Sequence, residues 1–168
     1  MNNLAKRVIT AVILVVALLL ALFALPSPAA EAFFGIFLAV GAWEWAGFWR
    51  ANAAWQRLLF VVALAGLAIA ATALISPGSG RALILGLGLL YWLVALALMM
   101  SGRELAQSWL IGLAGAIGLL VAWYSLQLLL AAEAGALLFV WCASLVAAAD
   151  IGAYFTGKQL GRRKLAPT

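Results

Sequence analysis

The sequence predicts an all-α membrane protein, a polytopic bundle of about six transmembrane helices. Two observations predict this class. Of the 168 residues, 68% are hydrophobic and only 9% are charged, whereas soluble domains are about half apolar and one quarter charged. The apolar residues also gather into runs of about 20, the length that crosses the hydrocarbon core of a bilayer. We therefore expect a single transmembrane domain over residues 1–168 and no soluble domain.

The breaks between the apolar runs coincide with residues that interrupt helices or carry charge. Pro26 and Pro28 follow the first run, and Pro77 lies between the third and the fourth. Proline and glycine are typical of turns, and the other breaks are short polar or charged stretches. The predicted helices cover about residues 8–25, 32–49, 58–75, 82–100, 109–131 and 136–155.

Basic residues are distributed unevenly between the two sides of this predicted domain. If the sides alternate from the N-terminus, one side carries nine lysines and arginines and the other carries only Arg81. Cytoplasmic segments are enriched in these residues, so the bias predicts that both termini are cytoplasmic. The nine residues are Lys6, Arg7, Arg50, Arg57, Arg103, Lys158, Arg162, Arg163 and Lys164.

The composition also excludes several classes of site. There is no histidine and one cysteine, Cys142, so neither a disulfide within the chain nor a zinc site is expected. Any metal would be a hard ion held by carboxylates and phosphates. The basic residues lie at the ends of apolar runs, where they contact lipid headgroups, so nucleic acid is not an expected partner.

Five acids are available: Glu31, Glu44, Glu104, Glu133 and Asp150. We interpret Glu31, Glu104 and Glu133 as solvated charges in linkers. Glu44 and Asp150 lie inside apolar runs, where a charge costs several kcal/mol and normally faces a partner or a cavity. For Glu44, two interpretations remain open: a part in shaping a substrate cavity, or a headgroup-level belt. In the belt, Trp43, Trp45 and Trp49 lie at the interface and Glu44 pairs with an arginine.

Asp150 begins the most informative segment. On a helix, Asp150, Tyr154 and Lys158 share a stripe, and Asp150 lies about 12 Å from Lys158 along the axis. This predicts a carboxylate near the cytoplasmic end of the sixth helix, within reach of a nucleotide. The alternative is a structural hydrogen bond from Tyr154 or Lys158 to Asp150. Gly152–Lys158 matches the start of a phosphate-binding loop, but no strand precedes it and Gln159 replaces Ser or Thr, so we reject that interpretation.

Two other features surround this segment. The tail residues Arg162, Arg163 and Lys164 follow Lys158 and would contact anionic lipid or bind the phosphates of a substrate. In the fifth helix, Gly112, Gly115 and Gly118 predict close helix packing rather than a site.

The stretch Asp150–Pro167, DIGAYFTGKQLGRRKLAP, closely resembles the middle of bacterial phosphatidate cytidylyltransferases. Residues 6–11 and 41–46, KRVITA and GAWEWA, resemble the opening and the second-helix motif of the same family. The resemblance implies an enzyme of phospholipid synthesis in the bacterial cytoplasmic (inner) membrane. It joins CTP to phosphatidic acid, with Mg²⁺, to give CDP-diacylglycerol and pyrophosphate. A homodimer is left open.

Taken with the resemblance, the residue pattern gives a candidate site. Asp150 would be catalytic and a magnesium ligand. The substrate contacts would be Tyr154, Lys158, Arg162, Arg163, Lys164 and Glu44.

One departure from the family is large. The family continues past the position of Pro167 into a Ser-Pro-Gly-Lys loop, further helices and a signature that supplies metal-binding aspartates. We therefore expect this chain to be an N-terminal portion that does not catalyse alone. The alternative function is a small membrane transporter or scaffold that uses Glu44 and Asp150 as intramembrane polar sites.

Overall fold

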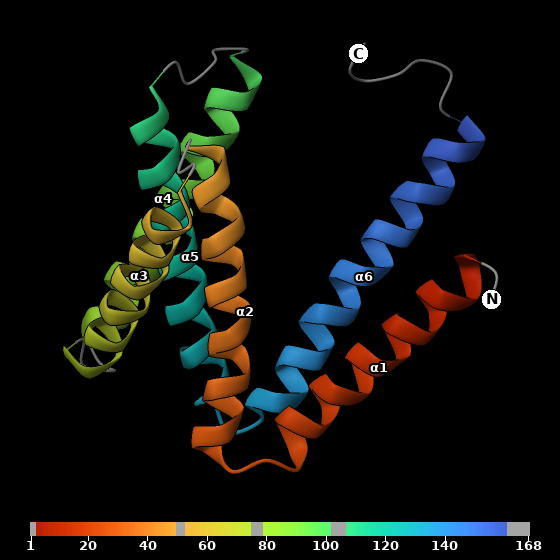
Figure 1. The fold of residues 1–168 in the computed structure, drawn as a ribbon. Helices are drawn as coiled ribbons and strands as arrows, with labels where there is room; N and C mark the ends of the chain where they lie inside the picture. Colours follow the sequence, from red (N-terminus) through yellow and green to blue (C-terminus); the bar gives the residue numbers. More distant parts are fainter. Residues whose placement is uncertain (1–2, 50–52, 75–78, 102–106, 161–168) are drawn as a thin grey trace. The chain divides into compact units, whose positions relative to one another are not determined.

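The structure is a computed structural model, and it describes residues 3–49, 53–74, 79–101 and 107–160. These residues form six α-helices, and no strand occurs among them (Figure 1). The helices are α1 (Asn3–Phe23), α2 (Ser27–Phe48), α3 (Ala54–Leu74), α4 (Ser79–Met100), α5 (Ser108–Leu130) and α6 (Gly135–Leu160). The predicted all-α class is confirmed.

Five of these helices, α2 to α6, are long and apolar enough to cross a membrane. The apolar part of α1 is shorter, Val8–Phe23. The chain is thus a multi-pass membrane protein. A sixth crossing by α1 and the cytoplasmic location of the termini stay predictions.

The start of α2 corrects one expectation from the sequence. Pro26 is its N-cap residue, with φ −65° and ψ 151°, and the helix begins at Ser27 with Pro28 in its first turn. Proline suits this position because its missing N–H and fixed φ cost nothing there. Glu31 therefore lies on α2, exposed, and its assignment to a linker was wrong. Glu133 does lie between helices, and Glu104 lies outside the described residues.

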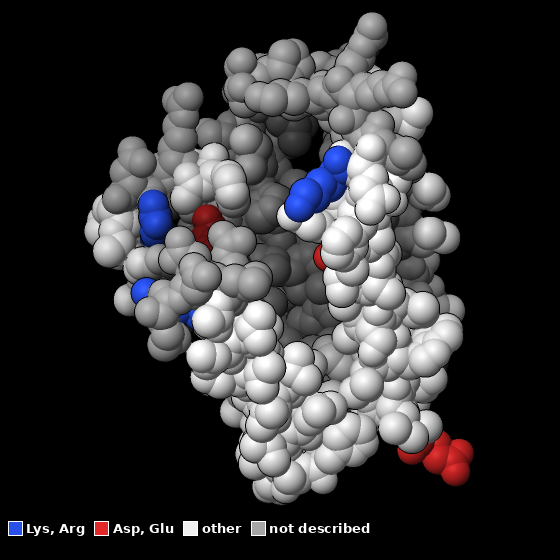
Figure 2. All heavy atoms as spheres, turned by 90° about the vertical axis from the view of Figure 1, so that its right-hand side faces the viewer, with Lys and Arg blue, Asp and Glu red and all other residues white. Residues whose placement is uncertain are grey.

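The chain forms two compact units, residues 1–128 with α1 to α5 and residues 129–168 with α6. The core of the first unit is small. Its buried apolar side chains come mainly from α2 and α3, where alanines let the two helices approach closely. In the described part of the unit they are Ala21, Phe34, Ala42, Ala46, Leu64, Ala68 and Tyr124. Most large apolar side chains face outward, as expected where lipid is the solvent. Figure 2 shows few Lys, Arg, Asp or Glu side chains among the described residues of one face.

Helix α5 lies against α2 and α4, and its glycines receive aromatic side chains. The indole of Trp45 (α2) fills the space where a methyl group on Gly115 would lie, and its Nε1–H donates to the carbonyl of Ile111 over 2.8 Å. Tyr91 (α4) lies against Gly118 in the same way, and its hydroxyl donates to the carbonyl of Ala114 over 3.0 Å. Each accepting carbonyl belongs to the residue four positions before the glycine.

The third glycine has the same role. A methyl group on Gly112 would lie 3.1 Å from Cδ2 of Trp49. The prediction that these glycines serve packing is confirmed. Trp45 and Trp49 pack on α5, and the headgroup depth that the belt interpretation gives them stays a prediction. Only Trp43 of the three is exposed, at 39%.

Candidate functional site

Helix α6 carries the predicted site on one continuous element. It runs to Leu160, five residues beyond its predicted end, so Asp150, Tyr154 and Lys158 all lie on it. Their spacing of four places them on one stripe, about 6 Å apart along the axis. The helix has 26 residues, about 39 Å in length, which exceeds the roughly 30 Å hydrocarbon core. Its C-terminal turns can therefore emerge at a membrane surface.

The three side chains of this stripe are exposed, Tyr154 at 63%. The ring of Tyr154 meets that of Phe155 edge to face, with centroids 5.5 Å apart. In the described part of the chain, no hydrogen bond or ion pair joins Asp150 to Tyr154 or Lys158. The structure thus gives no support to the interpretation of Asp150 as the acceptor of a structural hydrogen bond.

The segment Gly152–Lys158 is helical throughout. A phosphate-binding loop needs a turn between a strand and a helix, so its rejection is confirmed. A methyl group added at Gly152 or Gly157 would meet no atom within 4 Å, and the Thr156 hydroxyl donates within the helix to the Gly152 carbonyl over 2.7 Å. The tail residues Arg162, Arg163 and Lys164 lie outside the described residues, so their phosphate contacts stay a prediction.

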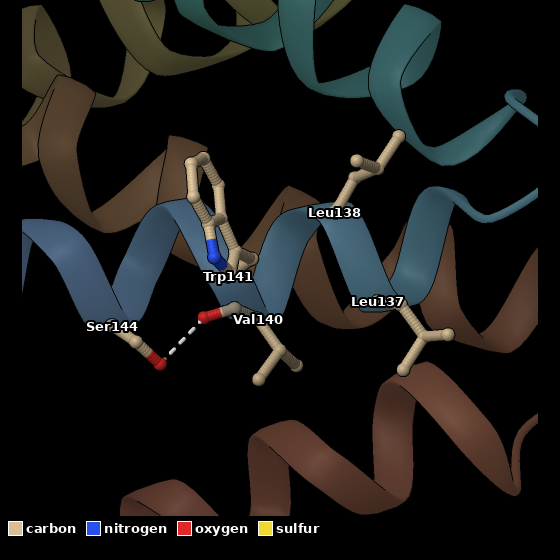
Figure 3. Close-up of a pocket in the computed structure, with 5 residues that line it drawn as sticks. All are labelled: Leu137, Leu138, Val140, Trp141 and Ser144. Carbon is tan, nitrogen blue, oxygen red and sulfur yellow. Dashed lines mark hydrogen bonds between the residues drawn. The ribbon is translucent and has the colours of Figure 1, made fainter.

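A hollow on α6, shown in Figure 3, lies nearer the start of the helix. Leu137, Leu138, Val140 and Trp141 give it an apolar lining. The remaining lining residue, Ser144, directs its hydroxyl to the Val140 carbonyl at 2.7 Å, the dashed line in Figure 3. The hollow therefore offers neither a carboxylate nor a cation to a nucleotide or a phosphate, and the candidate site is the Asp150 stripe.

Glu44 lies on α2, in the other compact unit, and is exposed. Arg57 lies at the same end of α2, and the sequence indicated only that this arginine helps to set the orientation of the chain in the membrane. The guanidinium of Arg57, from the first turn of α3, lies 5.9 Å from the Trp43 ring centroid. Its Nη2 lies 3.6 Å from the position of a methyl group on Gly47. Gly47, three residues after Glu44, has no side chain and so leaves room for another residue beside α2. This was the sequence feature that could have indicated the contact with Arg57.

The structure does not decide between the two interpretations of Glu44. Arg50, the arginine nearest to it in sequence, lies outside the described residues. No ion pair of Glu44 occurs in the described part of the chain. Arg57 brings a cation to the same end of α2, which is compatible with either a headgroup contact or a cavity wall.

The described residues contain no group of three or more His, Cys, Asp or Glu side chains that could hold a metal ion. A site built wholly from protein ligands is thus not formed among them. Magnesium commonly takes only one or two carboxylates and completes its shell with water and substrate phosphates. Asp150 fits that more limited role, as a single exposed carboxylate with a cation two turns further along the helix.

Comparison with known proteins identifies a family for this chain. The sequence profile of the Cytidylyltransferase family matches residues 5–168. A phosphatidate cytidylyltransferase of Pseudomonas aeruginosa is 35% identical over 169 residues, which are 98% of this chain and 61% of the relative. One of Haemophilus influenzae is 33% identical over 185 residues, 98% of this chain and 64% of the relative. This chain therefore spans less than two thirds of the length of either relative.

No solved structure gives a significant match. The profile match extends through α2, α5 and the whole Asp150 stripe, and so includes every described candidate residue. The chain is a member of the cytidylyltransferase family.

Proposed function

We propose that this chain takes part in the transfer of a cytidylyl group from CTP to phosphatidic acid, which yields CDP-diacylglycerol and pyrophosphate. The observation that carries the proposal is the family match over residues 5–168, together with two relatives named for this activity. The bacterial relatives and the spanning helices support a place in the cytoplasmic membrane.

In this reaction a phosphate oxygen of phosphatidic acid attacks the α-phosphorus of CTP. The bond to the bridging oxygen breaks, and pyrophosphate leaves with that oxygen. Both reactants are polyanions, so catalysis depends mainly on holding them in line and neutralising charge. A membrane helix that presents a carboxylate and cations beyond the hydrocarbon core suits this task.

The α6 stripe supplies those groups. Lys158 would contact a phosphate as a point charge, assisted by Arg162, Arg163 and Lys164 of the tail. Tyr154, exposed between Asp150 and Lys158, would donate its hydroxyl to a phosphate or ribose oxygen. In the first unit, Glu44 and Arg57 would contact a phospholipid headgroup at their end of α2.

Magnesium fits Asp150 only as one ligand of a mixed shell. When bound, the ion would neutralise charge on the CTP phosphates and orient the α-phosphorus. Asp150 would hold it directly or through water, and the other ligands would be phosphate oxygens, water and groups outside the described residues. A homodimer stays an expectation that cross-linking in native membranes would test.

A chimera tests the proposed function. Residues 1–168 are joined to the part of the Pseudomonas aeruginosa relative that the alignment does not cover, in a strain depleted of its own phosphatidate cytidylyltransferase. We expect growth and formation of labelled CDP-diacylglycerol from labelled CTP. The relative's remaining part alone is the control and should give neither.

The 168-residue chain is assayed alone in the same strain, which tests the expectation that it does not catalyse by itself. An inserted chimera without CTP-dependent turnover of phosphatidic acid would contradict the proposed function. Turnover by residues 1–168 alone would show instead that the chain already contains the required metal ligands.

A further inference from the structure

A groove runs along the first unit between one face of α4 and one face of α5. On α4 its lining extends from Tyr91 to Met99, and on α5 from Leu110 to Ile117, with Trp45 of α2 as the remaining lining residue. Its volume is about 670 Å³, which is within the range of pockets for a small ligand. None of these residues belongs to the Asp150 stripe.

The polar side-chain atoms of the lining are already used. Trp45 Nε1–H donates to the Ile111 carbonyl, and the Tyr91 hydroxyl donates to the Ala114 carbonyl. Every other lining side chain is aliphatic or a thioether. A polar occupant would lose its hydrogen bonds to water without replacement, at a cost of several kcal/mol. The groove therefore suits a hydrocarbon.

The dimensions of the groove distinguish a lipid chain from a protein helix. Met99 follows Tyr91 by eight positions, about 12 Å along the axis, and lies one residue before the end of α4. Leu110 is two residues after the start of α5. The groove thus begins near the helix ends, where we expect both helices to leave the membrane, and extends for about one leaflet, half of a roughly 30 Å core. A transmembrane helix would contact α4 and α5 across both leaflets.

The width of the groove also fits a single acyl chain. Ala95 and Ala114 are half-buried and leave room at the floor, while Val94 and Leu113 are each 50% exposed at the rim. We propose that this groove holds one acyl chain of a phospholipid from the leaflet in which α4 ends and α5 begins. The bound chain covers Trp45 and Tyr91 and the hydrogen bonds that join α5 to its neighbours.

The test uses the 168-residue chain in nanodiscs of phosphatidylethanolamine and phosphatidylglycerol. A small fraction of the phosphatidylethanolamine carries a photoactivatable diazirine in the middle of one acyl chain. After illumination, labelled residues are identified by peptide mass spectrometry. We expect Val94, Leu98 and Leu113 to be labelled at least about fivefold more than Leu93 and Leu96, which face lipid on α4 outside the groove.

A matched pair of variants tests the same site by filling it. Ala95→Phe places a ring in the groove, and Ala97→Phe places the same ring on the outer face of α4. Groove labelling should fall at least about fivefold in the first variant and stay unchanged in the second. Equal labelling of groove and outer residues in the wild-type chain would overturn the proposal. So would cross-links between two chains at the groove, which would identify a second copy as the occupant. Because the wild-type measurement needs no substitution, the test stands if Ala95→Phe does not insert.

Discussion

Asp150 lies fifteen residues into α6, exposed, with Tyr154 one turn and Lys158 two turns further along. A carboxylate in such an apolar helix is retained where it has a task or a partner, and no partner for it occurs in the described part of the chain. Glu44 is also exposed on an apolar helix, but Arg57 brings a positive charge to the same end of α2. The two acids therefore differ in what their removal should do.

We predict that Asp150→Asn lowers the rate of the active chimera at least about tenfold, equivalent to about 1.4 kcal/mol of barrier. The substitution keeps size and hydrogen bonding but removes the charge that would hold magnesium. Initial rates of CDP-diacylglycerol formation and the amount of inserted protein provide the measurement. Glu44→Gln is the comparison, and a larger loss there would place the reaction nearer α2.

Trp45 and Trp49 form a natural pair for measuring one hydrogen bond. Both indoles pack against glycines of α5, but only Trp45 has a partner for its N–H, whereas Nε1 of Trp49 is buried without one in the described structure. Trp45→Phe should therefore destabilise the protein by about 0.5–1.5 kcal/mol more than Trp49→Phe. Thermal unfolding in the same detergent measures the difference. Equal losses would mean that ring volume alone matters.

At the scale of elements, α5 meets aromatic side chains of its neighbours through its three glycines. Gly112, Gly115 and Gly118 present backbone to Trp49, Trp45 and Tyr91, which come from two different helices. Hydrocarbon outside the bundle gives little hydrophobic drive for association, so such close contacts and hydrogen bonds stabilise membrane helices together.

We predict that Gly115→Ala is destabilising by about 1–3 kcal/mol, because the new methyl group overlaps the Trp45 indole and α2 must move. Gly86→Ala on α4 is the matched control, since a methyl group there meets no atom within 4 Å. Comparing the two variants by thermal unfolding checks the prediction. A Gly115→Ala protein as stable as the control would show that the α2–α5 contact is not needed.

At the scale of the whole molecule, the distribution of lysine and arginine predicts where the ends of the chain lie. A reporter enzyme that is active only in the periplasm, fused after Thr168, should give no activity, because nine of ten basic residues fall on one side. A reporter that is active only in the cytoplasm is the paired control and should give full activity. Strong periplasmic activity would exclude six crossings, including the one assigned to α1.

The sequence was sufficient for the class of protein, the number of helices and the stripe on α6. These follow from apolar run length and from helical spacing, which are local properties of the chain. The sequence prediction placed Glu31 in a linker, which was wrong. A hydrophobic pattern does not show whether Pro28 lies in a turn or in the first turn of a helix, as it does in α2. The substrates were named from the Asp150–Pro167 resemblance and not from the spacing of residues.

Only the tertiary structure decided which partner each aromatic side chain has. One of the two sequence interpretations grouped Trp43, Trp45 and Trp49 by their spacing alone. In the structure Trp45 and Trp49 pack on α5, whereas Trp43 contacts Arg57 of α3. The same holds for the groove, whose lining comes from α2, α4 and α5. In a membrane most positions of every helix are apolar, so the pattern along a helix no longer marks which face is buried. Contacts between helices are then set by side-chain shape, a property of pairs of helices that no single segment encodes.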